Sequence, residues 1–128
     1  MINVLIVEPY KLPYEKKIPN TLEAKQEIVG GNIECADLLD DYYVTLICNE
    51  EGKLKSLPIN RDIGYDIIAG TFIVAGFDDI EGKFISLTDE QIEKYKKRFD
   101  KESIIKTEEK IVSLLLNKKS KENLEINN

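Results

Sequence analysis

The feature that most constrains the fold is a change of hydrophobic pattern at Thr88. Before it, apolar residues occur in short β-branched and aromatic runs that glycine, proline or asparagine interrupts. After it, they recur three or four positions apart, which is the period of an amphipathic helix. Thr88 and Gln91 have the spacing of a capping box, in which each side chain bonds the backbone amide of the other residue. Strands followed by helices are typical of an α+β domain.

The chain before Thr88 predicts one short helix among several strands. Asn20 is the expected cap of this helix, which ends at Gly30 and Gly31 because glycine readily adopts the left-handed conformation of a helix end. A tight hairpin turn is expected from Asn49 to Gly52. The expected strands cover residues 2–7, 32–39, 42–48, 53–57, 65–77 and 84–87, with an extended or edge segment at 10–17.

The length of 128 residues and a hydrophobic content of 42% supply one core. We therefore expect a single compact α+β domain, with a mostly antiparallel sheet, one short N-terminal helix and two C-terminal helices. Residues 1–99 form its body. Residues 100–117 form a helix that packs on the sheet or at a dimer interface, and residues 118–128 form a polar flexible tail.

Composition excludes several classes of function. The chain has no histidine, so a Ser-His-Asp or Cys-His nucleophile, a histidine-based zinc site and an imidazole pH switch are excluded. The glycine-rich loops of P-loop and dinucleotide-binding proteins are missing as well. A formal charge of −6 argues against nucleic acid as the partner. We expect no cofactor and no bound metal.

The same features predict where the protein works. No apolar run approaches the roughly 20 residues that span a bilayer, and the N-terminus lacks the basic start of a secretory signal. Cys35 and Cys48 are the only cysteines, whereas small secreted domains usually carry several disulfides. We therefore expect two buried free thiols in a cytoplasmic protein without membrane contact.

The residues Asn60, Arg61, Tyr65, Gly70 and Thr71 are candidates for a small-ligand site. Arg61 is the first arginine of the chain and could grip a carboxylate or phosphate with two parallel hydrogen bonds. Gly70 and Thr71 interrupt an apolar strand, where backbone amides and a hydroxyl could approach a ligand. The structural alternatives are an ion pair between Arg61 and a nearby aspartate, and a bend in a twisted sheet.

Other surfaces could bind a macromolecule. Glu50 and Glu51 place two carboxylates side by side on a turn, where they could contact a basic partner or hold a divalent cation. Tyrosine is the dominant aromatic residue, and several tyrosines could anchor a protein interface. They are Tyr10, Tyr14, Tyr42, Tyr43, Tyr65 and Tyr95. The apolar residues of the C-terminal helices also offer a surface for a homo-oligomer.

Consecutive stretches of the chain resemble domain-of-unknown-function family 3846. They are residues 30–34, 46–54, 57–61, 66–76 and 86–95, so the resemblance covers about residues 2–99. Its most diagnostic positions are mostly turn formers. The family recurs in small accessory proteins of bacteria, phages and mobile elements, and no activity is attached to it.

The resemblance implies a non-catalytic binding protein of phage or mobile-element type that counteracts host defence in the bacterial cytoplasm. We expect it either to sequester a small anionic, nucleotide-derived ligand at the Arg61 region or to block a host protein through an apolar or acidic face. The alternative is a metal-dependent hydrolase that uses the turn carboxylates Glu50 and Glu51.

Overall fold

The structure, a computed structural model, describes the backbone of residues 1–127 and the side chains of residues 1–122. Its elements in chain order are β1 (Ile2–Val7), β2 (Tyr14–Ile18), α1 (Leu22–Val29), β3 (Ile33–Leu38), β4 (Asp41–Asn49), β5 (Ile59–Asp62), β6 (Ile67–Ala69), β7 (Phe72–Asp78), β8 (Lys83–Ile85), α2 (Asp89–Arg98) and α3 (Lys101–Asn127). The α+β class predicted from the sequence is confirmed.

Six strands form the main sheet, in the order β2-β1-β7-β4-β3, and β8 pairs with the end of β7. All of these pairs are antiparallel, as expected. β1 and β7 lie in the middle of the sheet and read as almost continuous apolar runs, because side chains on both of their faces are buried. β5 and β6 form a separate antiparallel pair.

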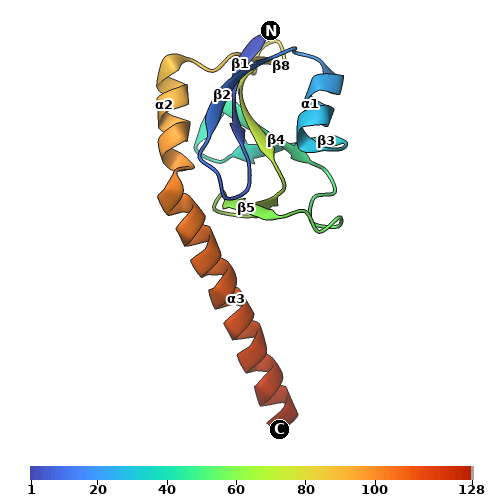
Figure 1. Ribbon diagram of the computed structural model, residues 1–128, viewed down its shortest axis with the longest axis vertical. Helices are drawn as coiled ribbons and strands as arrows, with labels where there is room; N and C mark the ends of the chain where they lie inside the picture. The colour runs from blue at the N-terminus through green and yellow to red at the C-terminus, as the bar shows by residue number, and fades with distance from the viewer. Residues whose placement is uncertain (128) are drawn as a thin grey trace.

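Each face of the main sheet has its own core, and α2 and α1 lie on opposite sides of the sheet (Figure 1). On one face, α2 packs Tyr95 and Phe99 against the sheet, and the rings of Phe99 and Phe72 meet edge to face with centroids 5.3 Å apart. On the other face, α1 packs Val29 against Ile47 of β4 and its neighbours. The two helices therefore hold the sheet between them.

The cap of α1 differs from the prediction by one residue. Thr21 is the N-cap, and its hydroxyl accepts a hydrogen bond from the amide of Ala24 at 3.2 Å. Asn20 is engaged elsewhere, because its amide donates to the carbonyl of Phe84 at 3.0 Å and its Oδ1 accepts from the buried Lys25 at 2.8 Å. The predicted end of the helix is confirmed, since Gly30 has a φ of 79°.

The predicted hairpin after β4 is wrong. Residues 50–56 form consecutive turns, and no strand covers 53–57. Asn49 is buried. Its side-chain amide donates to the carbonyl of Val29 at 3.1 Å and so links the end of β4 to the end of α1. Gly52 lies so close to the backbone of Ala69 that a Cβ atom would approach the Ala69 oxygen to 2.6 Å. The Gly52 amide does close a turn on the Asn49 carbonyl at 3.2 Å, but this turn joins no pair of strands, and both residues serve packing between distant segments.

α2 begins at the predicted capping box, in which the Thr88 hydroxyl accepts from the Gln91 amide at 3.2 Å. α3 follows and leaves the body, so that its C-terminal end lies far from the sheet (Figure 1). The sequence predicts an end of this helix near Asn117 and a flexible tail after it, but the helix continues to Asn127. Neither glycine nor proline occurs in residues 118–127, so no residue there breaks the helix.

The two cysteines are free thiols, as expected, but only one of them is buried. Cys48 lies in the core, where burial first and the nearby Glu34 second raise its pKa to about 12. Cys35 is exposed, which corrects the prediction of two buried thiols. No helix within the described residues has the length and apolarity needed to cross a membrane.

Candidate functional site

Arg61, the centre of the predicted ligand site, lies in the interior with an exposed fraction of 0%. Its Nε donates to the Ser103 hydroxyl at 2.9 Å, and its Nη1 donates to Oδ1 of Asn60 at 2.8 Å. Its Nη2 donates to the carbonyls of Lys11 at 2.6 Å and Phe99 at 3.0 Å. Burial lowers the pKa of this guanidinium. The side chain thus ties β5 to the β1–β2 connection and to the junction of α2 and α3.

The aspartates that flank Arg61 in the sequence do not pair with it. Asp62 pairs with Lys110 of α3 at 3.0 Å, and Asp66 pairs with Lys53. The ion pair between Arg61 and a neighbouring aspartate, which was the structural alternative, is therefore wrong. Arg61 does have a structural role, but through other partners. Two side-chain oxygens and two backbone carbonyls, all neutral, accept its hydrogen bonds, while the charge of Asp100 partly opposes the lowering of its pKa by burial.

Asn60 and Gly70 belong to the same interior network. The side-chain amide of Asn60 donates to the carbonyl of Val7 at 2.8 Å and to that of Gly70 at 2.9 Å. Gly70 has a φ of 86°, a left-handed conformation that glycine adopts without strain. Its amide donates to the carbonyl of Pro58 at 2.7 Å. Thr71 follows it and is half-buried. These contacts fasten β5 and the β6–β7 turn to β1.

The remaining predicted residues lie elsewhere. Tyr65 is exposed, its hydroxyl donates to the carbonyl of Asp37 at 2.9 Å, and its ring lines a groove between β6 and α3. Glu51 pairs with Lys55 at 3.6 Å, while Glu50 lines a separate cavity of about 110 Å³. Within the described residues, no three His, Cys, Asp or Glu side chains are grouped as a metal ion would require.

A different surface gathers exposed apolar side chains with carboxylates. It surrounds the β3–β4 turn, where Leu39 is 80% exposed and Tyr42 is 83% exposed. A hollow of about 330 Å³ separates this turn from the end of β7. We call this region the hairpin surface, and define it by Asp37, Leu39, Asp41, Tyr42, Phe77 and Asp79.

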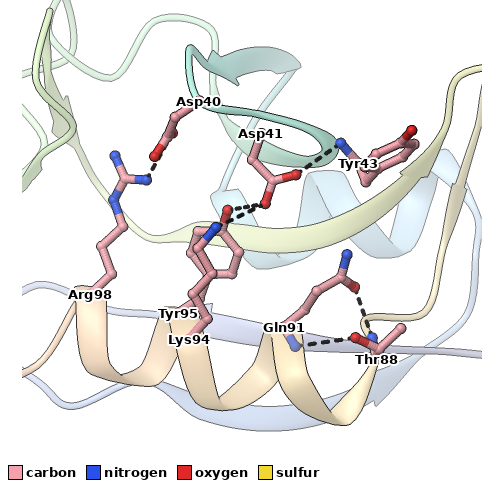
Figure 2. Close-up of polar contacts among 8 residues, drawn as sticks. All are labelled: Asp40, Asp41, Tyr43, Thr88, Gln91, Lys94, Tyr95 and Arg98. Atoms are coloured by element: carbon pink, nitrogen blue, oxygen red, sulfur yellow. Dashed lines mark hydrogen bonds and ion pairs between the residues drawn. The ribbon is translucent and has the colours of Figure 1, made fainter.

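The β3–β4 turn is held rigidly against α2 (Figure 2). The Tyr95 hydroxyl donates to Asp41 at 2.5 Å, and Lys94 pairs with the same carboxylate at 3.5 Å. The other Asp41 oxygen accepts from the amide of Tyr43 at 3.0 Å. Arg98 pairs with Asp40 at 3.3 Å, one turn further along α2. Side chains from the helix therefore fix both aspartates of the turn.

These contacts shift two pKa values in opposite directions. Burial alone would raise the pKa of Asp41, but the hydrogen bonds from Tyr95 and Tyr43 and the charge of Lys94 outweigh it, so the pKa is lowered. Burial first, and the Asp41 carboxylate second, raise the pKa of Tyr95. At neutral pH the pair is therefore a phenol that donates to a carboxylate.

The charge of the hairpin surface is negative. Its hollow is lined by Asp37, Asp41 and Asp79 and by no basic side chain. Asp41 is paired with Lys94. Asp37 and Asp79 have no ion-pair partner among the residues that the structure describes. Two carboxylates thus remain available beside exposed apolar groups.

A buried hydroxyl lies at the floor of the same hollow. Thr45 is 5% exposed, and its Oγ1 accepts or donates no hydrogen bond within the described part of the chain. Cys35 lies close by, and the partial burial of its thiol raises its pKa, although the residue as a whole is exposed.

The sequence pointed to only part of this surface. Tyr42 and Tyr43 were among the tyrosines considered as interface anchors, but Asp37, Leu39 and Asp79 were not singled out. An exposed leucine beside two tyrosines on a turn was the available signal. The hollow itself also needs Asp79, which the β7–β8 turn contributes.

The fold defines a small antiparallel α+β domain with a long C-terminal helix. Residues 2–100 match the family model described as Domain of unknown function (DUF3846), so the chain belongs to that family. The resemblance noted in the sequence is confirmed over the body of the protein. No curated protein and no solved structure matches the chain. The whole of α3 lies outside the matched residues.

Proposed function

We propose that this protein is a non-catalytic binding protein that blocks a host protein by docking onto a basic segment of it through the hairpin surface. In this proposal it is an accessory protein of phage or mobile-element type that counteracts host defence in the bacterial cytoplasm. The free thiols Cys35 and Cys48 suit that reducing compartment.

One observation carries the proposal: exposed Leu39 and Tyr42 lie beside the carboxylates of Asp37 and Asp79, which form no ion pair with any residue that the structure describes. Aromatic and apolar anchors surrounded by charges of one sign are typical of a surface that binds an oppositely charged protein segment. The turn is already fixed on α2 through Tyr95, so its backbone loses little conformational entropy when a partner binds.

The two other functions raised by the sequence have less support. A small anion at Arg61 would have to displace the acceptors that its guanidinium already bonds in the interior. A hydrolase built on Glu50 and Glu51 would need further metal ligands, and Glu51 is paired with Lys55. We therefore place the binding activity at the hairpin surface.

A random peptide display library, selected on the full-length protein, tests this proposal. We expect enriched peptides to carry Lys or Arg next to a large apolar residue. Replacing Leu39 and Tyr42 together by serine should lower the affinity for these peptides by about 100-fold. Each of these side chains, once a bound peptide buries it, contributes roughly 1–2 kcal/mol. Leu54→Ser is the matched control, since Leu54 is equally exposed on a distant loop.

The charge component is tested with the Asp37→Asn and Asp79→Asn double variant. This variant should bind the same peptides with lower affinity, and the affinity should depend less on salt concentration. Peptides that bind the Leu39 and Tyr42 variant as tightly as the parent protein would refute the proposal. Enrichment of acidic or uncharged peptides would refute it as well.

A further inference from the structure

α3 has two different faces along its length. Its first turns pack on the body through the hydroxyl of Thr107, which accepts from the Asp62 amide at 3.0 Å, and through Lys110, which pairs with Asp62. The opposite face carries Ile105 and Val112, seven residues apart and therefore about two turns along one side of the helix. This second face points away from the body.

The second face is apolar where the helix leaves the body. Val112 is 55% exposed, Leu115 is 62% exposed and Leu116 is 60% exposed. A helical segment without tertiary packing is only marginally stable in water, and it gains stability mainly by burying an apolar face. The projecting half of α3 therefore needs an apolar surface to pack on, and a second helix of the same kind provides one.

Charged residues flank this apolar stripe in an asymmetric order. Glu108 precedes it and Lys119 follows it, eleven residues or about three turns later, so both lie on the same side of the helix. Neither has an ion-pair partner among the residues that the structure describes. By contrast, Lys106 pairs within the helix with Glu102.

We infer that two copies of this chain associate through antiparallel pairing of their α3 helices. In this pair the two α3 helices run in opposite directions and are related by a two-fold axis that passes between residues 113 and 114. The axis places Glu108 of each copy opposite Lys119 of the other copy. The same rotation places Val112 opposite Leu115 of the other copy. In a parallel pair, like charges would face each other at both positions.

This arrangement also leaves room for the globular bodies. The contacts of α3 with β5 lie on the face of α3 opposite to Val112. A helix from the second copy can therefore pack along the apolar stripe without meeting the body of the first copy. The bodies lie at opposite ends of the paired segment. The inference uses none of the residues of the hairpin surface and stands independently of the proposed function.

Light scattering coupled to size-exclusion chromatography measures the association. The full-length protein at about 100 µM should have twice the mass of the 14.7 kDa chain. Replacing Val112 and Leu115 by serine should raise the dissociation constant by about 100-fold, because both apolar contacts are lost in each copy. Both side chains are exposed in the single chain, and circular dichroism checks that its fold is kept.

Charge reversal tests the direction of pairing. Glu108→Lys alone and Lys119→Glu alone should each weaken the dimer by about tenfold or more, and the double variant should restore it. Lys121→Glu is the matched control, because position 121 lies on the other side of the helix from position 119. In a Cys35→Ser background, Glu108→Cys chains mixed with Lys119→Cys chains should form a mixed disulfide.

Three results would overturn the inference. They are a monomer at 100 µM, a dimer that the Val112 and Leu115 variant leaves intact, and efficient disulfide formation between two Glu108→Cys chains. The last result would show parallel pairing. Restoration by the double charge reversal, together with the mixed disulfide, would support the antiparallel dimer.

Discussion

Arg61→Ala tests whether the buried guanidinium is a structural link between distant parts of the chain. Its hydrogen bonds reach the β1–β2 connection at Lys11, and Phe99 and Ser103 at the junction of α2 and α3. Alanine removes all of these donors at once. The same variant separates the structural role from the ligand role that the sequence suggested, since a ligand contact on the surface contributes little to folding.

The size of the effect follows from the acceptors that lose their donor. The bonds to Asn60 Oδ1 and to the Phe99 carbonyl are buried, and a buried acceptor without a donor costs about 1–2 kcal/mol. The partly buried bonds to Lys11 and Ser103 add about 0.5 kcal/mol each, because water can reach these acceptors. The expected loss is therefore about 3–5 kcal/mol.

Urea unfolding followed by circular dichroism measures this loss, which corresponds to a fall in melting temperature of about 12–20 °C for a chain of this size. Arg61→Lys should lose most of the same stability, because a lysine ammonium cannot reach acceptors on three sides. Arg98→Ala is the matched control and should lose about 1 kcal/mol or less, since Arg98 makes one partly exposed ion pair with Asp40 and one contact with the Phe99 ring, 5.7 Å from its centroid. A loss below 1 kcal/mol for Arg61→Ala would refute the structural role.

Two further predictions concern the fixed turn and a close backbone approach. The pKa of Asp41 is lowered on folding, so its stabilisation is complete above the ordinary value of 3.8 and is lost as the pH falls further. The pKa of Tyr95 is raised, so its stabilisation is complete below the ordinary value of 10.0 and is lost as the pH rises. Tyr95→Phe should therefore flatten both ends of the curve of unfolding free energy against pH, and an unchanged curve would contradict this. Gly52→Ala should cost about 1–3 kcal/mol in urea unfolding, because its Cβ would lie 2.6 Å from the Ala69 oxygen, and a loss under 0.5 kcal/mol would show that the loop simply moves.

Local signals were enough to predict most elements of the fold. The Thr88 and Gln91 capping box marked the start of α2, and Gly30 marked the end of α1, because both devices act within a few residues of chain. The hairpin at Asn49 and Gly52 failed for the opposite reason. Turn residues were present, but contacts with α1 and β6 decide their conformation, and those contacts join distant segments.

The candidate site was harder to predict because pairing of charges depends on tertiary structure. Sequence proximity suggested that Arg61 pairs with an adjacent aspartate. The fold instead brings Lys110 from α3 to Asp62, and this leaves Arg61 to bond the backbone. The hairpin surface likewise combines two turns that lie far apart in the sequence, so no single motif encodes it.

The two proposed surfaces together make a prediction that neither makes alone. The hairpin surface is fastened to α2. The apolar stripe belongs to α3, whose C-terminal part projects from the body (Figure 1). An antiparallel dimer would therefore carry two hairpin surfaces at a fixed separation. A partner with two basic segments would gain affinity by avidity, and this gain would disappear in the monomeric Val112 and Leu115 variant. Binding of a single peptide would be the same in both forms, because the variant does not touch the hairpin surface.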